Sequence, residues 1–192
     1  MQPITPLIQV RNLSHGVIRD LSFSWPAGVH WICGDEGRGK TTLLRLLAGE
    51  LAPEHGSVTT PLGDVFWVDL LDASHDANTV HLCWQNQRSR HAHWDEALRV
   101  ELSHALKVSE HHNKQLHMLS AGTRRKVGII AALASGATVT LLDQPFAALD
   151  MASIRVLHDF LHEAAEQRHR AWIVADYEAP THLPQASVLT LP

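Results

Sequence analysis

Residues 34–42 read Gly34-Asp35-Glu36-Gly37-Arg38-Gly39-Lys40-Thr41-Thr42. The stretch fits the pattern G-x-x-x-x-G-K-[ST], a loop whose backbone N–H groups converge on phosphate oxygens. Its glycines allow a tight concave turn that side chains would obstruct. Lys40 adds a positive charge, the Thr41 hydroxyl is a predicted Mg²⁺ ligand, and the following helix directs its partially positive N-terminus at the anion. We therefore expect the whole stretch to bind the phosphates of a nucleoside triphosphate.

The flanking sequence supports this interpretation. A short apolar run at residues 29–33 suits a buried strand, and residues 42–48 favour a helix that ends before Gly49. Strand, glycine loop and helix is the order that such a site requires. The alternative is a glycine-rich turn that carries a lysine by chance, and it gives no reason for these flanks.

Composition limits the classes of protein to consider. The chain has 192 residues, of which 45% are hydrophobic, so we expect one compact domain over residues 1–192. A net charge of -4 without a run of lysine and arginine argues against nucleic acid as a partner. We also expect no secretory signal, because residues 1–7 lack a basic segment followed by an apolar one.

The apolar run at residues 127–142 and the cysteines fit the interior of a cytoplasmic protein. Ser135-Gly136 and two threonines interrupt the run, which favours a buried helix and strand over a membrane span. Cys33 and Cys83 lie in runs that we interpret as strands, without metal or redox spacing. We expect buried free thiols in a reducing cytosol.

The first half of the chain predicts mostly strands. Short apolar runs between residues 8 and 25 indicate a small antiparallel β region, and residues 53–57 form a turn cluster. Residues 65–68 and 80–84 are rich in β-branched and aromatic side chains, so we interpret both as strands.

Residues 86–120 differ in character and predict a small helical subdomain. Apolar residues recur there at helical spacing among many histidines. A metal site is one interpretation of those histidines, but no pair at i, i+4 has a close carboxylate partner. Solvated faces of short helices are the simpler interpretation.

From residue 120 onward, helices and strands alternate. The expected order is helix 123–134, strand 138–142, helix 153–166, strand 171–175 and a final strand at 187–191. Such alternation is typical of a mainly parallel sheet. The predicted fold is α/β: a P-loop NTPase fold with a mainly parallel sheet, an N-terminal antiparallel β subdomain and a small helical subdomain.

Further motifs follow the phosphate loop in a recognisable order. Gln85 comes after the predicted strand 80–84, Leu119-Ser120-Ala121-Gly122-Thr123 precedes the strand that ends in Asp143, and Ala147-Ala148-Leu149-Asp150 follows it. Together they resemble the glutamine loop, LSGGQ signature, acidic strand and D-loop of ATP-binding-cassette (ABC) proteins. The short form is most similar to the compact ATPase subunit of the cytochrome c maturation haem exporter and related transporters.

The resemblance implies a role for each matching residue. Asp143 and Gln85 would serve Mg²⁺, the former through water, since a hard cation prefers oxygen ligands. Ser120 and Gly122 would contact the γ-phosphate of ATP held by a second ABC ATPase subunit. On simpler interpretations, Asp143 caps a turn and Ser120 caps a helix. Ala121 and Thr123 depart from the usual Gly and Gln of the signature.

Two positions of the catalytic machinery also depart from the family pattern. Gln144 stands where the family has the glutamate that polarises the attacking water, and an amide cannot accept that proton. General-base assistance contributes about 10²- to 10⁴-fold. Asp176 stands where the family has a histidine that senses the γ-phosphate, unless the alignment is shifted by one residue to Tyr177, which is no histidine either.

Three explanations remain open for these departures. Gln144 could position water in a slow ATPase, the chain could pair with a competent second subunit, or Asp176 could act as a displaced base. In each case the resemblance implies an ATP-binding transporter subunit with Mg²⁺ and ATP as cofactors, peripheral at the cytoplasmic face and partnered by separate integral membrane subunits. The alternative function is a soluble ABC switch that regulates a partner by ATP-dependent dimerisation. A P-loop kinase has no role for the signature or D-loop.

Overall fold

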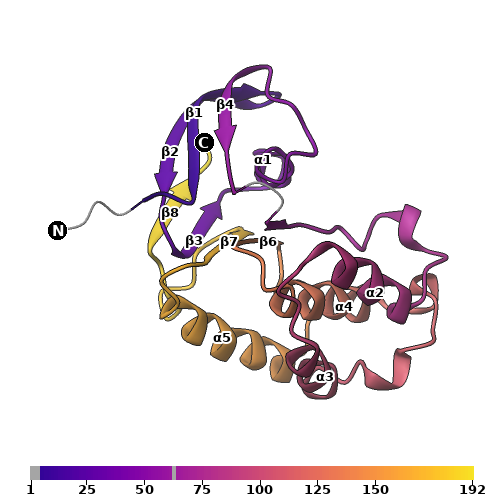
Figure 1. Ribbon diagram of the computed structural model, residues 1–192. Coiled ribbons are helices and arrows are strands. Elements are labelled where there is room, and N and C mark those ends of the chain that lie inside the picture. Colours follow the sequence, from indigo (N-terminus) through magenta and orange to yellow (C-terminus); the bar gives the residue numbers. More distant parts are fainter. Residues whose placement is uncertain (1–4, 62–63) are drawn as a thin grey trace. The chain divides into compact units, whose positions relative to one another are not determined.

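The computed structural model describes residues 5–61 and 64–192 and divides into two compact units (Figure 1). We call Met1–Trp67, Thr138–Gln144 and Phe160–Pro192 the sheet unit. We call Val68–Ala137 and Pro145–Asp159 the helical unit. The helical region expected at residues 86–120 is therefore part of a larger unit, which also includes the flanking residues of Val68–Ala137 and the segment Pro145–Asp159.

The sheet unit contains a parallel sheet of five strands. Its order is β5-β6-β7-β3-β8, and every neighbouring pair is parallel. The strands are β3 (Gly28–Cys33), β5 (Val65–Phe66), β6 (Val139–Asp143), β7 (Ala171–Asp176) and β8 (Ser187–Thr190). All residues of β3 are buried, as the continuous apolar run at 29–33 predicts for a strand covered on both faces. The predicted parallel sheet is confirmed.

An antiparallel sheet forms the other part of the sheet unit. Its order is β2-β1-β4, with β1 at Ile8–His15, β2 at Ile18–Trp25 and β4 at His55–Thr59. The prediction of a turn at residues 53–57 missed β4. A Cβ at Gly56 would come within 2.3 Å of the carbonyl oxygens of Arg11 and Asn12 in β1. Glycine therefore allows the close pairing of β4 with β1 at this position.

Helix α1 (Lys40–Leu47) packs between the two sheets of this unit (Figure 1). Leu43 and Leu44 are fully buried and belong to one core cluster with Ile8 of β1 and Ile173 of β7. Burial of one such side chain contributes about 1.5–3 kcal/mol. The core therefore fixes the axis of α1, and with it the place where the phosphate loop meets the helix.

The helical unit consists of helices and short 3-10 turns. The helices are α2 (Val80–Arg90), α3 (Glu96–Ala105), α4 (Ala121–Ala134) and the first part of α5 (Met151–Ala165), and the turns are η1 (Ala73–His75), η2 (Ser109–His111) and η3 (Leu116–Met118). The indole Nε1 of Trp84 in α2 donates to the carbonyl oxygen of Val127 in α4 at 3.1 Å.

The prediction of a strand at residues 80–84 is wrong, because these residues begin α2. Thr79 caps the helix through its Oγ1, which accepts from the backbone N–H of Leu82 at 3.1 Å. Val80, Cys83, Trp84 and Gln87 are the buried residues of α2. Their spacing of three, four and seven residues is that of one helical face.

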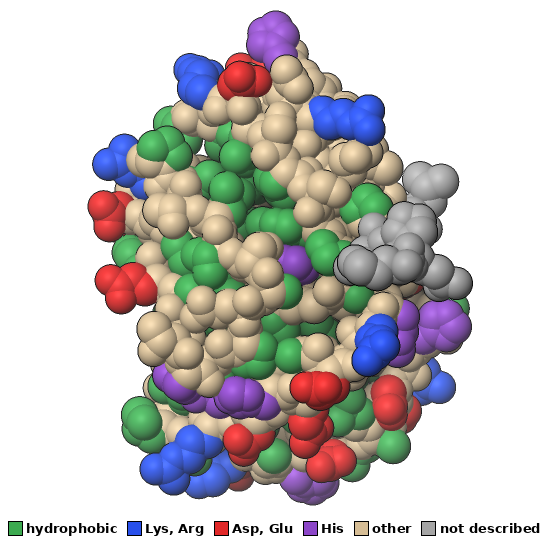
Figure 2. All heavy atoms as spheres, turned by 90° about the vertical axis from the view of Figure 1, so that its left-hand side faces the viewer, with side chains coloured by type: hydrophobic (Ala, Val, Ile, Leu, Met, Phe, Trp, Pro, Cys, Tyr) green, Lys and Arg blue, Asp and Glu red, His purple; other side chains and the backbone are tan. Residues whose placement is uncertain are grey.

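Apolar side chains occupy the middle of the face drawn in Figure 2, and charged side chains lie mostly around its margin.

Cys33 and Cys83 are buried free thiols, as expected from the sequence. Burial raises the pKa of Cys83 to about 11, so its thiol is protonated at neutral pH. Across residues 5–61 and 64–192, no helix is long and apolar enough to span a membrane.

Candidate functional site

The phosphate loop connects β3 to α1 and depends on its glycines. Gly34, Gly37 and Gly39 have φ angles of 146°, 78° and 92°, a region that other residues rarely adopt. Gly39 is the N-cap of α1, and no side chain accepts a hydrogen bond from the first turn there. The free N–H groups and the positive end of the helix dipole suit an anion. The loop therefore has the geometry that the motif predicts.

Lys40 is the cation of this loop and is almost completely buried, with 5% exposure. Its Nζ donates hydrogen bonds to the carbonyl oxygens of Gly34 at 2.5 Å and Asp35 at 2.8 Å. Nζ also lies 4.9 Å from the centre of the Tyr177 ring, a cation–π contact. Sequence reasoning did not find this contact, because nothing in the sequence indicates that the ring turns toward the loop.

Thr41 and Asp143 meet beside the loop. Asp143 ends β6, whose carboxyl end lies at the same edge of the parallel sheet as that of β3. The Thr41 hydroxyl donates to Oδ2 of Asp143 at 2.5 Å. A hydroxyl and a carboxylate are hard oxygen ligands, so these residues fit Mg²⁺ carried in by nucleotide phosphates. Within the described part of the chain, no group of three or more His, Cys, Asp or Glu could hold a metal ion.

Gln144 and Asp176 lie at this same edge. Gln144 follows Asp143 with a φ angle of 43°, and its backbone N–H donates to the carbonyl oxygen of Ala175 at 2.8 Å. Asp176 is the last residue of β7, and its Oδ1 accepts from the backbone N–H of Tyr177 at 2.8 Å. One oxygen of the Asp176 carboxylate is therefore directed at the backbone of the next residue.

Gln85 lies on α2 of the helical unit and is exposed. Its assignment as a nucleotide and Mg²⁺ ligand assumed that a strand precedes it, and that assumption is wrong. One edge strand of the parallel sheet is β5, which ends at Phe66 and is the strand that precedes the helical unit. Residues 67–72 follow β5 and contain no glutamine. The chain therefore has no glutamine directly after β5.

Ser120 and Gly122 begin α4 in the helical unit. Ser120 is the exposed N-cap, and its Oγ accepts from the backbone N–H of Thr123 at 3.1 Å. The simpler interpretation of Ser120 as a helix cap is thus correct, and its exposure leaves room for a second role. A Cβ at Gly122 would come within 2.3 Å of the Ala148 carbonyl oxygen. Packing inside the chain therefore requires glycine at position 122.

Polar contacts join helix α4, whose first turn resembles the LSGGQ signature, to residues 147–150, which resemble the D-loop. Arg125 Nη1 donates to the Ala147 carbonyl oxygen at 2.9 Å, and Lys126 Nζ forms an ion pair with Asp150 Oδ2 at 2.6 Å. The hydrogen bond from Lys126 and those from Ser153 lower the pKa of the Asp150 carboxyl. These contacts fix the two motifs relative to each other.

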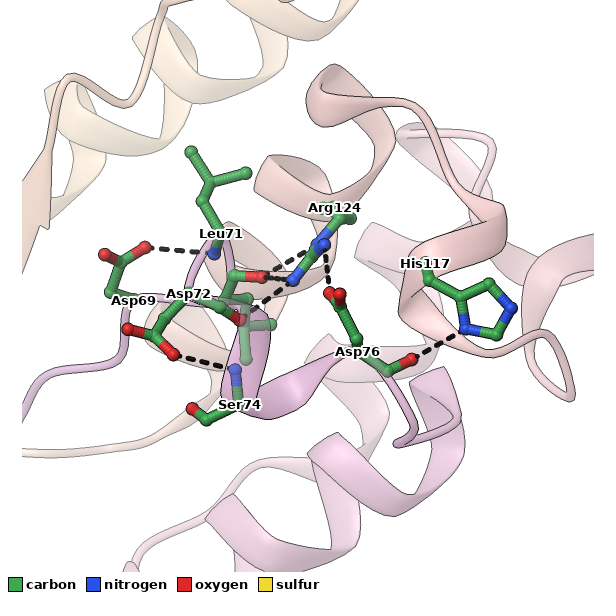
Figure 3. A network of polar contacts seen from close by, with 8 residues as sticks. Asp69, Leu71, Asp72, Ser74, Asp76, His117 and Arg124 are labelled. Atoms are coloured by element: carbon green, nitrogen blue, oxygen red, sulfur yellow. Dashed lines mark hydrogen bonds and ion pairs between the residues drawn. The ribbon is translucent and has the colours of Figure 1, made fainter.

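Arg124, also on α4, holds the segment that follows β5 (Figure 3). Its Nε donates to the Leu70 carbonyl oxygen at 2.8 Å, Nη2 donates to that of Asp72 at 3.1 Å, and Nη1 pairs with Asp76 Oδ1 at 2.6 Å. His117 Nδ1 donates to the Asp76 carbonyl oxygen at 3.1 Å. One guanidinium therefore satisfies several oxygens of this segment.

Comparison with known proteins agrees with this geometry. The family described as ABC transporter matches residues 18–147, more than half of the chain. The chain belongs to this family. The cytochrome c biogenesis ATP-binding export protein CcmA of Paramagnetospirillum magneticum is 34% identical over 196 residues, which cover 91% of this ABC chain and 87% of CcmA. The predicted resemblance to a compact ABC ATPase is confirmed.

Another relative and a solved structure extend the comparison. The molybdenum import ATP-binding protein ModC of Brucella suis is 27% identical over 200 residues. The match covers 93% of this ABC chain but 54% of ModC, so the chain spans about half the length of that relative. A putative ABC transporter ATP-binding protein from Pyrococcus furiosus has a TM-score of 0.76 at 22% identity, with 96% of each chain covered. The ABC ATPase form of the P-loop NTPase fold is thus confirmed.

Proposed function

We propose that this chain is the ATP-binding subunit of an ABC transporter. It binds Mg-ATP at an interface with a second ATPase subunit and drives separate integral membrane subunits from the cytoplasmic face. The contact of Thr41 with Asp143 beside the buried Lys40 supports the proposal most strongly, because a hydroxyl and a carboxylate that suit Mg²⁺ lie together next to the loop. The names of the relatives CcmA and ModC, both ATP-binding proteins of export or import, support it.

Each residue has a physical role in this proposal. Lys40 and the loop N–H groups hold the phosphates, while Thr41 and Asp143 hold Mg²⁺, which neutralises charge on the phosphates when bound. Ser120 and Gly122 of the second subunit close over the γ-phosphate. Asp35, Glu36, Arg38 and Thr42 contribute backbone N–H groups to the same loop. Closure of two subunits around ATP then supplies the motion that the membrane subunits use.

We propose further that hydrolysis at this site is impaired. The Gln144 amide can position water but cannot take its proton. The Asp176 carboxylate accepts a hydrogen bond from the backbone of Tyr177, which supports Gln144 over Asp176 as the group that faces the water. The chain then either hydrolyses ATP slowly or pairs with a competent subunit. In the second case its own Ser120 and Gly122 complete the nucleotide site of that subunit.

The test measures steady-state ATPase activity of the purified chain alone and in complex with an integral membrane protein isolated with it from detergent-solubilised membranes. The proposal expects low activity alone and a higher, Mg²⁺-dependent activity in the complex. Lys40→Ala in the same complex is the matched control and should abolish the increase.

Recovery of the chain with a soluble partner, with no membrane protein and no stimulated activity, would contradict the transporter proposal. That outcome would favour the soluble ABC switch, in which ATP-dependent dimerisation regulates a partner. If ATP affects neither the activity of the membrane complex nor the dimerisation of the chain with a soluble partner, both functions are contradicted.

A further inference from the structure

Tyr177 contacts the phosphate loop in two ways. Its carbonyl oxygen accepts from the backbone N–H of Gly34 at 3.3 Å, and its ring lies over Lys40 Nζ at 4.9 Å. The side chain is 50% exposed and comes directly after the last residue of β7. Tyr177 is therefore fixed to the loop through its backbone, while its ring is only partly enclosed.

The Lys40 ammonium makes three contacts in this arrangement. It has three N–H donors, of which two are used on the carbonyl oxygens of Gly34 and Asp35. The negative face of the Tyr177 ring lies beside the same group. A phosphate that takes Lys40 as its counter-ion competes with these three contacts. The ring contact involves a half-exposed side chain, so it is the contact most easily replaced.

We propose that Tyr177 is a positioning residue whose ring competes with nucleotide phosphate for Lys40, so that the ring moves away from the ammonium when ATP binds. The inference rests on the proposed function, because it concerns the same nucleotide site. Tyr177 then sets the affinity of the site without contacting the reacting atoms, and it weakens binding of any nucleotide that needs Lys40.

The surroundings of the ring permit a clean test. Tyr177 lines a cavity of about 460 Å³ together with Arg38, Glu178 and the edge of β8. A smaller side chain at position 177 thus enlarges an open cavity and leaves the buried core intact. Tyr177→Phe keeps the aromatic face over Lys40, whereas Tyr177→Leu removes it while remaining apolar.

The first experiment compares the dissociation constant of Mg-ATP for the wild-type chain and these two variants by calorimetry. Loss of a cation–π contact at a partly exposed site predicts binding about two- to five-fold tighter for Tyr177→Leu, with Tyr177→Phe close to wild type. Unchanged or weaker binding by Tyr177→Leu, while the wild type binds, overturns this inference alone. Absence of binding in wild type and Tyr177→Leu overturns the proposed function, and the inference with it.

A second experiment uses the fact that Tyr177 is the one tyrosine of the chain. Incorporation of 3-fluorotyrosine places a single ¹⁹F reporter on this ring. Lys40→Ala should shift the resonance in the absence of nucleotide, and saturation of the wild type with Mg-ATP should move the resonance toward the Lys40→Ala position. A resonance that Lys40→Ala or Mg-ATP leaves unmoved overturns the inference, whatever the stability of the Leu variant.

Discussion

The hydroxyl of Thr41 donates a hydrogen bond to Oδ2 of Asp143 across 2.5 Å, although the residues are 102 positions apart in the sequence. Thr41 lies in the first turn of α1 and Asp143 at the end of β6. Their contact joins the phosphate loop to the acidic end of a strand within the same sheet unit. The fold thus brings a hydroxyl and a carboxylate together beside the phosphate loop.

Asp143→Asn should separate the magnesium role of this pair from its structural role. The amide keeps an oxygen that can accept from Thr41 but loses the negative charge. We expect the affinity for Mg-ATP to fall by about 10- to 100-fold, the usual effect of altering an outer-shell group at a metal site. Calorimetry should show no loss of affinity for ATP when EDTA removes Mg²⁺. An equal loss with and without Mg²⁺ would exclude the metal role.

Gln144→Glu should increase ATP turnover by about 10²- to 10⁴-fold, because it restores a group that can accept a proton from water. Both side chains have the same size and meet the same backbone strain at a φ angle of 43°. Gln144→Ala is the control and should fall below wild type if Gln144 positions water. A Glu variant that binds ATP but hydrolyses it no faster would show that Gln144 is not the defect.

Ser120→Asp should block ATP-dependent dimerisation. A carboxylate at this position would face the γ-phosphate of the opposite subunit and be repelled by it. Ser120→Asn is the matched control, since Asn and Asp both cap helices well and only one is charged. Analytical ultracentrifugation with Mg-ATP should give dimer for Asn and monomer for Asp. Equal dimer in both variants would remove Ser120 from the interface.

Gly122→Ala should destabilise the fold, because its Cβ would come within 2.3 Å of the Ala148 carbonyl oxygen. We expect the free energy of unfolding to fall by about 1–3 kcal/mol, as for other overpacked sites. Gly128→Ala on the same helix is the control, since its Cβ would approach Leu70 no closer than 3.7 Å. Removal of a helical glycine there should be neutral or stabilising. If urea unfolding gave the same change in the free energy of unfolding for both variants, the backbone at Ala148 would have to move away from the added Cβ at little cost.

Local sequence patterns were sufficient to predict the strands and helices around the phosphate loop. The apolar run at 29–33 became β3, and the alternation after residue 120 became α4, β6, α5, β7 and β8. The same patterns misled at residues 80–84, where β-branched and aromatic side chains suggested a strand. Burial of Val80, Cys83, Trp84 and Gln87 follows a helical period that was present in the sequence but that the strand interpretation overlooked.

Contacts between distant segments could not be predicted in the same way. The ring of Tyr177 reaches Lys40 only because β7 and β3 are neighbours in the sheet, and no local pattern gives its direction. Strand β4 depends on Gly56 fitting against β1, which is a tertiary requirement. Thr41 was assigned to Mg²⁺ from the phosphate-loop motif and Asp143 from the family resemblance, and neither assignment predicted the hydrogen bond between them.

Calorimetric titration of the purified chain with Mg-ATP, beside Lys40→Ala, tests the nucleotide site most directly. Thermal unfolding of both proteins should first establish that the variant is folded. We predict saturable binding of one ATP per wild-type chain and no measurable binding by Lys40→Ala. Binding of equal affinity in the two proteins, or its absence in the wild type, would contradict the assignment of residues 34–42 as a phosphate loop.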